Sequence, residues 1–183
     1  MRILSGELKG REIRFRPNPR LRPTADKVRK ALFDTLREKA DGARVLDLFS
    51  GTGALGFEAL SGGAAHATFV ESDANQCRAI RDNLRELGLE ERADVLRADA
   101  VSAARSLAKR GETYDLIFVD PPYEKGLAQQ AMEAVSEGGL MRAGALAVVE
   151  CRAAEELPAR IGALETARTR VYGDTKIVIY GTV

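Results

Sequence analysis

From residue 44 onward, short apolar runs alternate with longer segments in which apolar residues recur at helical spacing. Short apolar runs favour buried strands, and apolar positions three and four residues apart favour amphipathic helices. Strands that alternate with helices over short connections predict an α/β fold in which helices cover a parallel sheet. The predicted strands are residues 44–49, 67–72, 94–99, 114–120 and 145–151, and the predicted helices are 54–63, 74–88, 100–111 and 126–139.

The pattern changes at both ends of the chain. Two strand-like runs flank the segment YGDT within residues 164–183, which predicts a terminal antiparallel hairpin. Near the start, two short β-like runs flank residues 6–10, and a proline-broken, extended stretch follows. Residues 24–40 then predict a strong helix with Thr24 as its N-cap. Its buried face is predicted to hold Val28, Ala31, Leu32, Thr35 and Leu36.

Length and composition indicate a folded protein of ordinary kind. The 183 residues fit one domain, and the 45% of hydrophobic residues argue against disorder. No apolar run approaches the roughly 18 residues of a membrane span, and the first residues lack the apolar stretch of a signal peptide. Cys77 and Cys151 show no metal-ligand spacing and are interpreted as buried thiols in a reducing, cytoplasmic compartment. The lone histidine, His66, lies in a Gly/Ala-rich loop and is given no role, which argues against a His-based triad or a multi-histidine metal site.

The net charge of +1 is unevenly distributed along the chain. Residues 1–44 hold 13 Lys and Arg against six Asp and Glu, which gives this part a net charge of +7. Residues 45–183 have a net charge of −6. Such asymmetry favours a basic N-terminal arm that binds a polyanion.

A glycine-rich segment, VLDLFSGTGALG, connects the first predicted strand of the sheet to its helix. It places Gly51, Gly53 and Gly56 in a G-x-G-x-x-G pattern, which lets the backbone approach a ligand closely. By itself this pattern fits NAD, FAD or S-adenosylmethionine. The structural alternative is a plain glycine turn that Asp47 caps.

Acidic residues at the ends of the first three predicted strands narrow the choice of ligand. Glu71 follows Gly51 by 20 residues, where a carboxylate can accept both ribose hydroxyls, but NAD enzymes share this feature. Asp47 can meet an ammonium group and would repel a pyrophosphate, so it favours S-adenosylmethionine, which carries an amino-acid moiety. Asp99 fits either a hydrogen bond to the adenine amine or the N-cap of the next helix, and the two roles are compatible.

Several motifs together resemble one known family of enzymes. DLFSGTGALG, VESD, RADA and DPPY stand in the order and spacing of Rossmann-like S-adenosylmethionine-dependent N-methyltransferases. RPTADKVRKALFDTL and RVYGDTK resemble the RsmD-type bacterial 16S ribosomal RNA guanine-N2 methyltransferases, and the resemblance covers nearly the whole chain. It implies a mostly parallel, seven-stranded sheet with helices on both faces, an antiparallel last strand and a short N-terminal β-hairpin extension. It also implies a basic RNA-binding extension at residues 1–23 and a methyltransferase domain at residues 24–183.

The resemblance extends to individual positions of the motifs. It implies that the catalytic residues are Asp120, Pro121, Pro122 and Tyr123, and that no metal ion takes part. The residues that would bind S-adenosylmethionine are Thr24, Asp47, Ser50, Gly51, Gly53, Leu55, Glu71, Ser72, Asp99 and Ala100.

The DPPY segment suits the methylation of an exocyclic base amine. Such an amine is a poor nucleophile because its lone pair is delocalised into the ring. Asp120 and the carbonyl of Pro121 can accept both N–H hydrogens, which turns the lone pair toward the methyl donor. Two prolines hold that carbonyl and bring no competing N–H donor, and Tyr123 offers a ring on which the base stacks. The structural alternative is a Pro-Pro strand ending beside a buried tyrosine.

A base that reacts in this way must be flipped out of a helix or lie in an unpaired loop. The N-terminal cations are expected to bind the phosphates around it: Arg2, Lys9, Arg11, Arg14, Arg16, Arg20, Arg22, Lys27, Arg29 and Lys30. Among them the predicted substrate-binding residues are Arg11, Arg14, Arg16, Arg20 and Arg22. The expected partner is structured ribosomal RNA, naked or in an assembled small subunit, and no membrane is involved.

Three other functions fit parts of this pattern. A DNA or other RNA amino-methyltransferase would use the same chemistry. A nucleotide-binding oxidoreductase using NAD is supported only by the glycine loop and Glu71. A non-catalytic RNA-binding protein is opposed by the complete DPPY segment.

Overall fold

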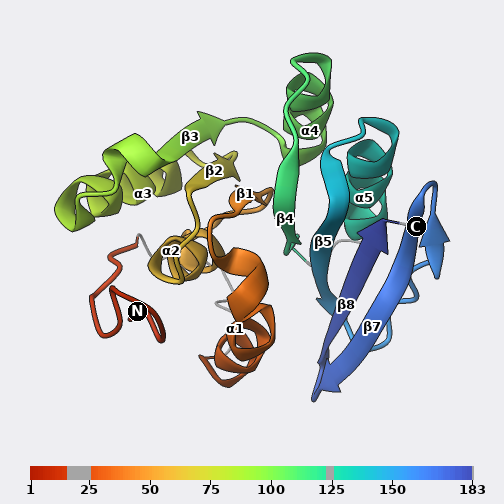
Figure 1. Cartoon of the computed structure of the whole chain (residues 1–183), viewed down its shortest axis with the longest axis horizontal. Coiled ribbons are helices and arrows are strands. Elements are labelled where there is room, and N and C mark those ends of the chain that lie inside the picture. Colours follow the sequence, from red (N-terminus) through yellow and green to blue (C-terminus); the bar gives the residue numbers. More distant parts are fainter. Residues whose placement is uncertain (16–25, 123–125, 183) are drawn as a thin grey trace.

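One β-sheet runs through the computed structural model, which describes residues 1–15, 26–122 and 126–182 (Figure 1). Within these residues the sheet has eight strands in the order β3-β2-β1-β4-β5-β8-β7-β6. The strands are β1 (Arg44–Asp47), β2 (His66–Glu71), β3 (Ala93–Arg97), β4 (Tyr114–Val119), β5 (Met141–Arg152), β6 (Arg160–Ile161), β7 (Leu164–Tyr172) and β8 (Thr175–Thr182). The first five are parallel to one another, and β8 lies antiparallel between β5 and β7. The predicted α/β class, with an antiparallel C-terminal hairpin, is confirmed.

The described sheet has eight strands where the resemblance implied seven. The additional strand is β6, in which Arg160 and Ile161 pair with the start of β7. Two residues are too few to show a strand periodicity in a sequence, so this edge strand depends on the turn at Gly162 that folds it back onto β7. His66 also differs from expectation, because it begins β2 instead of lying in a loop.

Helices cover both faces of the sheet, as Figure 1 shows. The helices are α1 (Asp26–Ala40), α2 (Ala54–Ser61), α3 (Ala74–Leu87), α4 (Ala100–Lys109) and α5 (Leu127–Glu137), with a 3-10 turn at Glu90–Arg92. Buried residues of α1, α2 and α3 form one core with alternate sheet residues such as Leu116 and Phe118. Residues of α4 and α5 form the other core with the intervening ones, such as Ile117 and Val119. Alternate residues of β4 thus pack into two separate cores, one on each face of the sheet.

The buried face of α1 is rotated slightly about the helix axis relative to the predicted face. Val28, Leu32 and Leu36 are buried as expected, but Thr35 is exposed. Phe33 is buried in its place, with its ring centroid 5.6 Å from that of Phe118 in β4. The contact with the aromatic side chain of the sheet sets the helix rotation, and the sequence of the helix alone does not contain that contact. The predicted N-cap, Thr24, lies outside the described residues.

The N-terminal segment, residues 1–15, folds back on itself and packs against α2. Its only bridge joins Arg2 to Glu12, so within residues 1–15 the expected β-hairpin is a hairpin-like turn without extended strands. Ile3 and Ile13 are each 1% exposed and belong to the core on the α2 side. The proposed boundary at residue 23 lies outside the described residues.

Candidate active site

The carboxyl ends of β1 and β4 lie side by side at the point where the strand order reverses. Asp47 of β1 is paired with Phe118 of β4, and the backbone N–H of Leu48 donates to the Phe118 carbonyl at 3.0 Å. Asp120 therefore lies two residues beyond Phe118, the partner of Asp47 on the neighbouring strand. In an open α/β sheet the crevice at such a reversal is where ligands bind. The fold brings the glycine loop and the DPPY segment to this one edge.

Asp47 is a buried carboxyl group with an unmatched oxygen. It is 1% exposed, and its Oδ2 accepts a hydrogen bond from the backbone N–H of Gly56 at 3.2 Å. Its Oδ1 is buried and has no hydrogen-bond partner within the described residues. Burial raises the pKa of Asp47 from 3.8 to about 7, opposed by the Gly56 hydrogen bond and assisted by the charge of Glu71. A cationic group placed at Oδ1 would relieve both the missing hydrogen bond and the desolvation of the charge.

The glycine loop needs its glycines for two different reasons. Gly53 has a φ of 80°, in the left-handed region, and its N–H donates to the Ser50 carbonyl at 2.6 Å to close the turn. A Cβ atom on Gly56 would lie 2.2 Å from the Phe69 ring of β2, so only glycine lets α2 approach the sheet this closely. The Ser50 hydroxyl donates to the Asp47 carbonyl at 2.8 Å and ties the loop to the end of β1. The loop is therefore held rigidly beside Asp47.

Glu71 joins the end of β2 to the glycine loop. Its Oε2 accepts from the Gly51 N–H at 2.8 Å, and its Oε1 accepts from the Asp73 N–H at 2.7 Å and the Ser72 hydroxyl at 3.3 Å. A carboxylate has about four lone-pair sites, so Oε2 retains capacity for a ligand hydroxyl. The predicted ribose role of Glu71 fits this geometry and stays a prediction.

At the end of β3, Asp99 is the N-cap of α4. Its Oδ1 accepts from the Ser102 N–H at 2.9 Å, which confirms the N-cap prediction. Its side chain is exposed, so a hydrogen bond to an adenine amine remains sterically open. Leu55 and Ala100, the apolar members of the predicted site, are buried in the two helix–sheet cores.

The described part of DPPY comprises Asp120, Pro121 and Pro122. Asp120 is half-buried, Pro121 is buried and Pro122 is exposed. Phe118 faces α1, and the alternation of β4 predicts that the side chain of Asp120, one residue after the strand ends, lies on the same side. Tyr123, Thr24, Arg16, Arg20 and Arg22, which the sequence also assigned to the site, lie outside the described residues.

Two of the predicted RNA-binding arginines lie on the N-terminal segment where it meets α3. Arg14 forms an exposed ion pair with Glu86 at 2.9 Å, and Arg11 donates to the Glu86 carbonyl at 3.4 Å. An exposed ion pair of this kind contributes at most about 1 kcal/mol, so Arg14 can exchange it for a phosphate.

Arg29 is not available to bind a phosphate, and that prediction is wrong. It is 1% exposed, and its Nε pairs with Glu58 of α2 at 3.1 Å. Its Nη2 also donates to the Arg2 carbonyl at 2.9 Å. Sequence reasoning missed the structural role of Arg29 and Glu58. The available signal was the place of Arg29 beside Val28 and Leu32, on the edge of the apolar face of α1.

The cysteines offer no nucleophile. Cys77 and Cys151 are both free and buried, as predicted. Burial raises the pKa of the Cys77 thiol and raises that of Cys151 to about 11. Both thiols therefore stay protonated at neutral pH, which disfavours a mechanism that needs a thiolate.

The described residues contain neither a metal-binding cluster nor a membrane-spanning helix. No set of three or more His, Cys, Asp or Glu side chains in residues 1–15, 26–122 and 126–182 is arranged to hold a metal ion. No helix in the same ranges is long and apolar enough to cross a membrane.

Comparison with known proteins places the chain among methyltransferases. Residues 1–181 match the family model described as Conserved hypothetical protein 95. The "Putative rRNA methyltransferase YlbH" of Bacillus subtilis is 37% identical over 180 residues, which cover 98% of each chain. The "Ribosomal RNA small subunit methyltransferase D" of Escherichia coli K12 is 35% identical over 98% of this chain and 89% of its own length. The solved structure of "Putative methyltransferase yhhF from Escherichia coli" superposes with a TM-score of 0.89 at 34% identity, covering 100% of this chain and 97% of that one.

Proposed function

The chain belongs to the Conserved hypothetical protein 95 family, the RsmD family, and on that premise we propose that it is a ribosomal RNA methyltransferase. In the finer form of the proposal, a methyl group passes from S-adenosylmethionine to the exocyclic N2 amine of a guanine in 16S ribosomal RNA. The reaction would take place in the cytoplasm, where the small subunit is assembled.

One observation carries the proposal. Asp47 ends β1 and Asp120 directly follows the neighbouring β4, at the reversal in strand order. The Oδ1 of Asp47 there is buried and has no partner among the described residues. An unpartnered buried carboxyl oxygen suits an ammonium group, and S-adenosylmethionine carries one in its methionine part. NAD carries a pyrophosphate, which the negative charge of Asp47 would repel.

The chain's own residues would hold the cofactor along the strand ends. Asp47 would bind the ammonium, Glu71 the ribose hydroxyls and Asp99 the adenine amine. Ser50, Gly51 and Gly53 would bring the backbone close to the ligand. When bound, S-adenosylmethionine supplies an electrophilic methyl group on a sulfonium.

Asp120 would act on the substrate amine. Its carboxylate and the Pro121 carbonyl accept the two N–H hydrogens, so the nitrogen lone pair points out of the base plane toward the cofactor side of the crevice. The prolines bring no N–H donor that would compete for these acceptors. Holding the two reactants in this geometry lowers the barrier by several kcal/mol.

The direct test is to identify the modified nucleoside. Purified protein is incubated with labelled S-adenosylmethionine and with 16S RNA or small subunits that lack the modification, and the digested RNA is analysed by mass spectrometry. We expect one mole of N2-methylguanosine per mole of RNA. A methylated cytosine or adenine, or methylation of duplex DNA in preference to RNA, would contradict the proposal.

Asp120→Asn tests the amine-acceptor role. We expect kcat to fall by about 100-fold or more, because one acceptor becomes a donor at the reacting nitrogen, while S-adenosylhomocysteine binding changes less than twofold. Asp94→Asn, at an exposed carboxylate on β3, is the matched control and should leave both quantities unchanged. Full turnover in Asp120→Asn would rule out this role.

The other candidate functions make distinct predictions in the same assays. A DNA or other RNA amino-methyltransferase would methylate its own substrate and leave 16S RNA unmodified. An oxidoreductase would bind NAD, and a non-catalytic RNA-binding protein would bind RNA without transferring a methyl group.

A further inference from the structure

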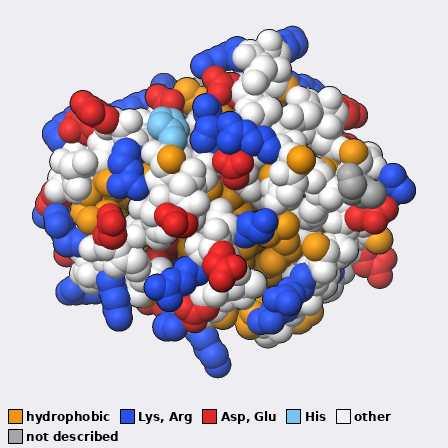
Figure 2. Space-filling view, in the orientation of Figure 1, with side chains coloured by type: hydrophobic (Ala, Val, Ile, Leu, Met, Phe, Trp, Pro, Cys, Tyr) orange, Lys and Arg blue, Asp and Glu red, His pale blue; other side chains and the backbone are white. Residues whose placement is uncertain are grey.

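A groove lies between α1 and the β7–β8 hairpin, on the face of the sheet toward which Asp120 is directed. It is lined by Ala31, Leu32, Thr35, Arg168, Arg170, Tyr172, Ile177 and Ile179. The space within it, open solvent included, is about 290 Å³, so it is a shallow surface groove and not an enclosed pocket. Figure 2 shows apolar surface between the positions of α1 and the hairpin, with Lys and Arg atoms beside it.

The strand registers connect this groove to the candidate active site. Val119 of β4 pairs with Val149 of β5, so Asp120 follows at the level of Glu150. Glu150 pairs with Ile177 of β8, and Ile177 pairs with Arg170 of β7. Arg170 therefore lies in the same row of the sheet as Asp120, three strand spacings or about 14 Å away. Glu150 is buried, so it does not place its charge on the surface between them.

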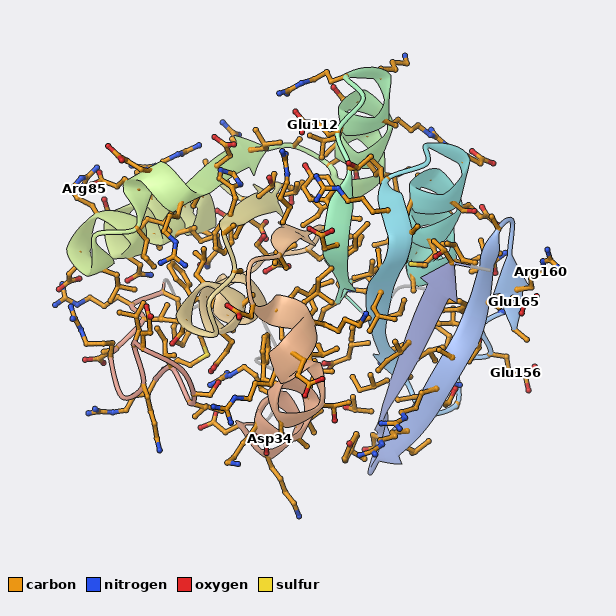
Figure 3. All side chains as sticks on the ribbon, viewed as in Figure 1. Asp34, Arg85, Glu112, Glu156, Arg160 and Glu165 are labelled. Carbon is orange, nitrogen blue, oxygen red and sulfur yellow. The ribbon has the colours of Figure 1, made fainter. Side chains whose placement is uncertain are left out.

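Arg168 and Arg170 are free cations. Both are exposed, and neither has a hydrogen bond or an ion pair within residues 1–15, 26–122 and 126–182. At the other end of the hairpin the positive charge is neutralised, because Arg160 of β6 lies 3.3 Å from Glu165 of β7 (Figure 3). The unpaired charge of β7 is thus confined to the part that lines the groove.

We propose that this groove binds the RNA strand that flanks the target nucleotide. Arg168 and Arg170 contact its phosphates, and a neighbouring base stacks on Tyr172 against the apolar floor. The inference rests on the proposed function, since it assigns a second contact for the same substrate. Two free arginines beside the partly exposed ring of Tyr172 fit a single-stranded polyanion with π-faces better than a protein surface. This contact would add to the affinity for RNA that the N-terminal cations supply.

Charge reversal in the groove is compared with a matched reversal elsewhere. The test variant is Arg168→Glu with Arg170→Glu. The control is Arg105→Glu with Lys109→Glu, two exposed α4 cations on the opposite face that also have no partner among the described residues. Both variants change the net charge equally, so any difference in RNA binding between them reflects where the substituted residues lie.

The measurement is binding of 16S RNA from cells that lack the enzyme, at several salt concentrations. We expect the groove variant to bind about 10- to 100-fold more weakly than the control and its log–log salt slope to fall by about 1.4, because each single-strand phosphate contact contributes about 0.7. S-adenosylhomocysteine binding should be the same in both variants. Equal RNA affinities and slopes for the two variants would overturn the inference.

A second pair of variants tests stacking. Tyr172→Ala should weaken RNA binding about tenfold without changing the salt slope, and Tyr172→Phe should bind like the unmodified protein. If the groove variants lose affinity only for assembled small subunits and keep it for naked RNA, the occupant is a ribosomal protein and the inference fails. If the unmodified protein does not methylate ribosomal RNA at all, the proposed function fails independently of this comparison.

Discussion

At the scale of single residues, the candidate site is built from carboxyl groups in very different surroundings. Asp47 is buried with one oxygen unpartnered, Glu71 is bound by backbone N–H groups, and Asp99 caps a helix in solvent. Burial, assisted by the charge of Glu71, raises the pKa of Asp47 to about 7. The sequence places all three at strand ends but does not show which of them is buried.

Asp47 predicts a pH dependence of cofactor binding. Its folded-state pKa of about 7 exceeds the reference value of 3.8, so the cofactor-free protein holds a proton that the unfolded chain has lost between these values. Stability should therefore decrease as pH rises from about 4 to about 7, by up to a few kcal/mol. A bound ammonium lowers the pKa of Asp47, so binding below pH 7 releases this proton.

The measurement is calorimetric titration with S-adenosylhomocysteine in buffers of different ionisation enthalpy. Affinity should rise by up to about tenfold per pH unit between pH 5 and 7 and then level off. Asp47→Asn should bind more weakly, show no proton release and be more stable at pH 8 when ligand-free. A pH-independent affinity in the unmodified protein would show that the ammonium does not lie at Asp47.

At the scale of secondary-structure elements, the N-terminal segment, α1 and α2 are joined by one buried network. Glu58 of α2 accepts from the backbone N–H groups of Leu4 and Ser5 at 2.8 and 3.3 Å and pairs with Arg29 of α1. Arg29 closes the network through the Arg2 carbonyl. Since α2 follows the glycine loop directly, this network holds the N-terminal segment in a fixed position relative to the glycine loop.

Glu58→Gln should destabilise the protein by about 3–5 kcal/mol, because it removes the buried counter-ion of Arg29 and leaves only Asp26, an exposed partner at 3.2 Å. Denaturant unfolding measures the change in the free energy of unfolding. Asp34→Asn is the control, since Lys30 and Asp34 are both more than 60% exposed and Asp34, labelled in Figure 3, lies near the middle of α1. It should change stability by less than about 0.5 kcal/mol. A similar loss in both variants would mean that the buried pair does not anchor the segment.

At the scale of the whole molecule, the functional surfaces share one edge and one face of the sheet. The glycine loop and Asp120 lie at the carboxyl edge beside α1, and the groove with Arg168 and Arg170 lies on the other side of α1. An RNA strand that binds this groove and presents one base to Asp120 needs no separate recognition domain. Specificity would then come from the shape of a folded RNA more than from base reading along the chain.

Thermal unfolding separates the methyltransferase from the oxidoreductase. S-adenosylhomocysteine at 100 times its Kd should raise the Tm by about 5–10 °C, because it stabilises the folded state by about 2.7 kcal/mol. NAD at the same concentration should leave the Tm unchanged, and Asp47→Asn should reduce the shift seen with S-adenosylhomocysteine. A shift with NAD alone would overturn the cofactor assignment.

The sequence by itself determined the alternation of strands and helices, the glycine loop and the acids at strand ends. These features are local. Residues close together in the chain are enough to show them: a hydrophobic period of two or of three to four residues, a G-x-G-x-x-G turn and a Pro-Pro strand ending. Parallel strands also share one carboxyl edge, so Asp47, Glu71, Asp99 and Asp120 were expected to lie together without knowledge of the strand order.

The tertiary structure decided what depends on contacts between distant segments. The rotation of α1 follows from Phe33 packing on Phe118, and the burial of Arg29 follows from Glu58, which lies 29 residues away. The raised pKa of Asp47 follows from the helix and strands that exclude water around it. The row from Asp120 to Arg170 exists only because β8 inserts antiparallel between β5 and β7. The local pattern predicts the β7–β8 hairpin, but not the pairing of β8 with β5.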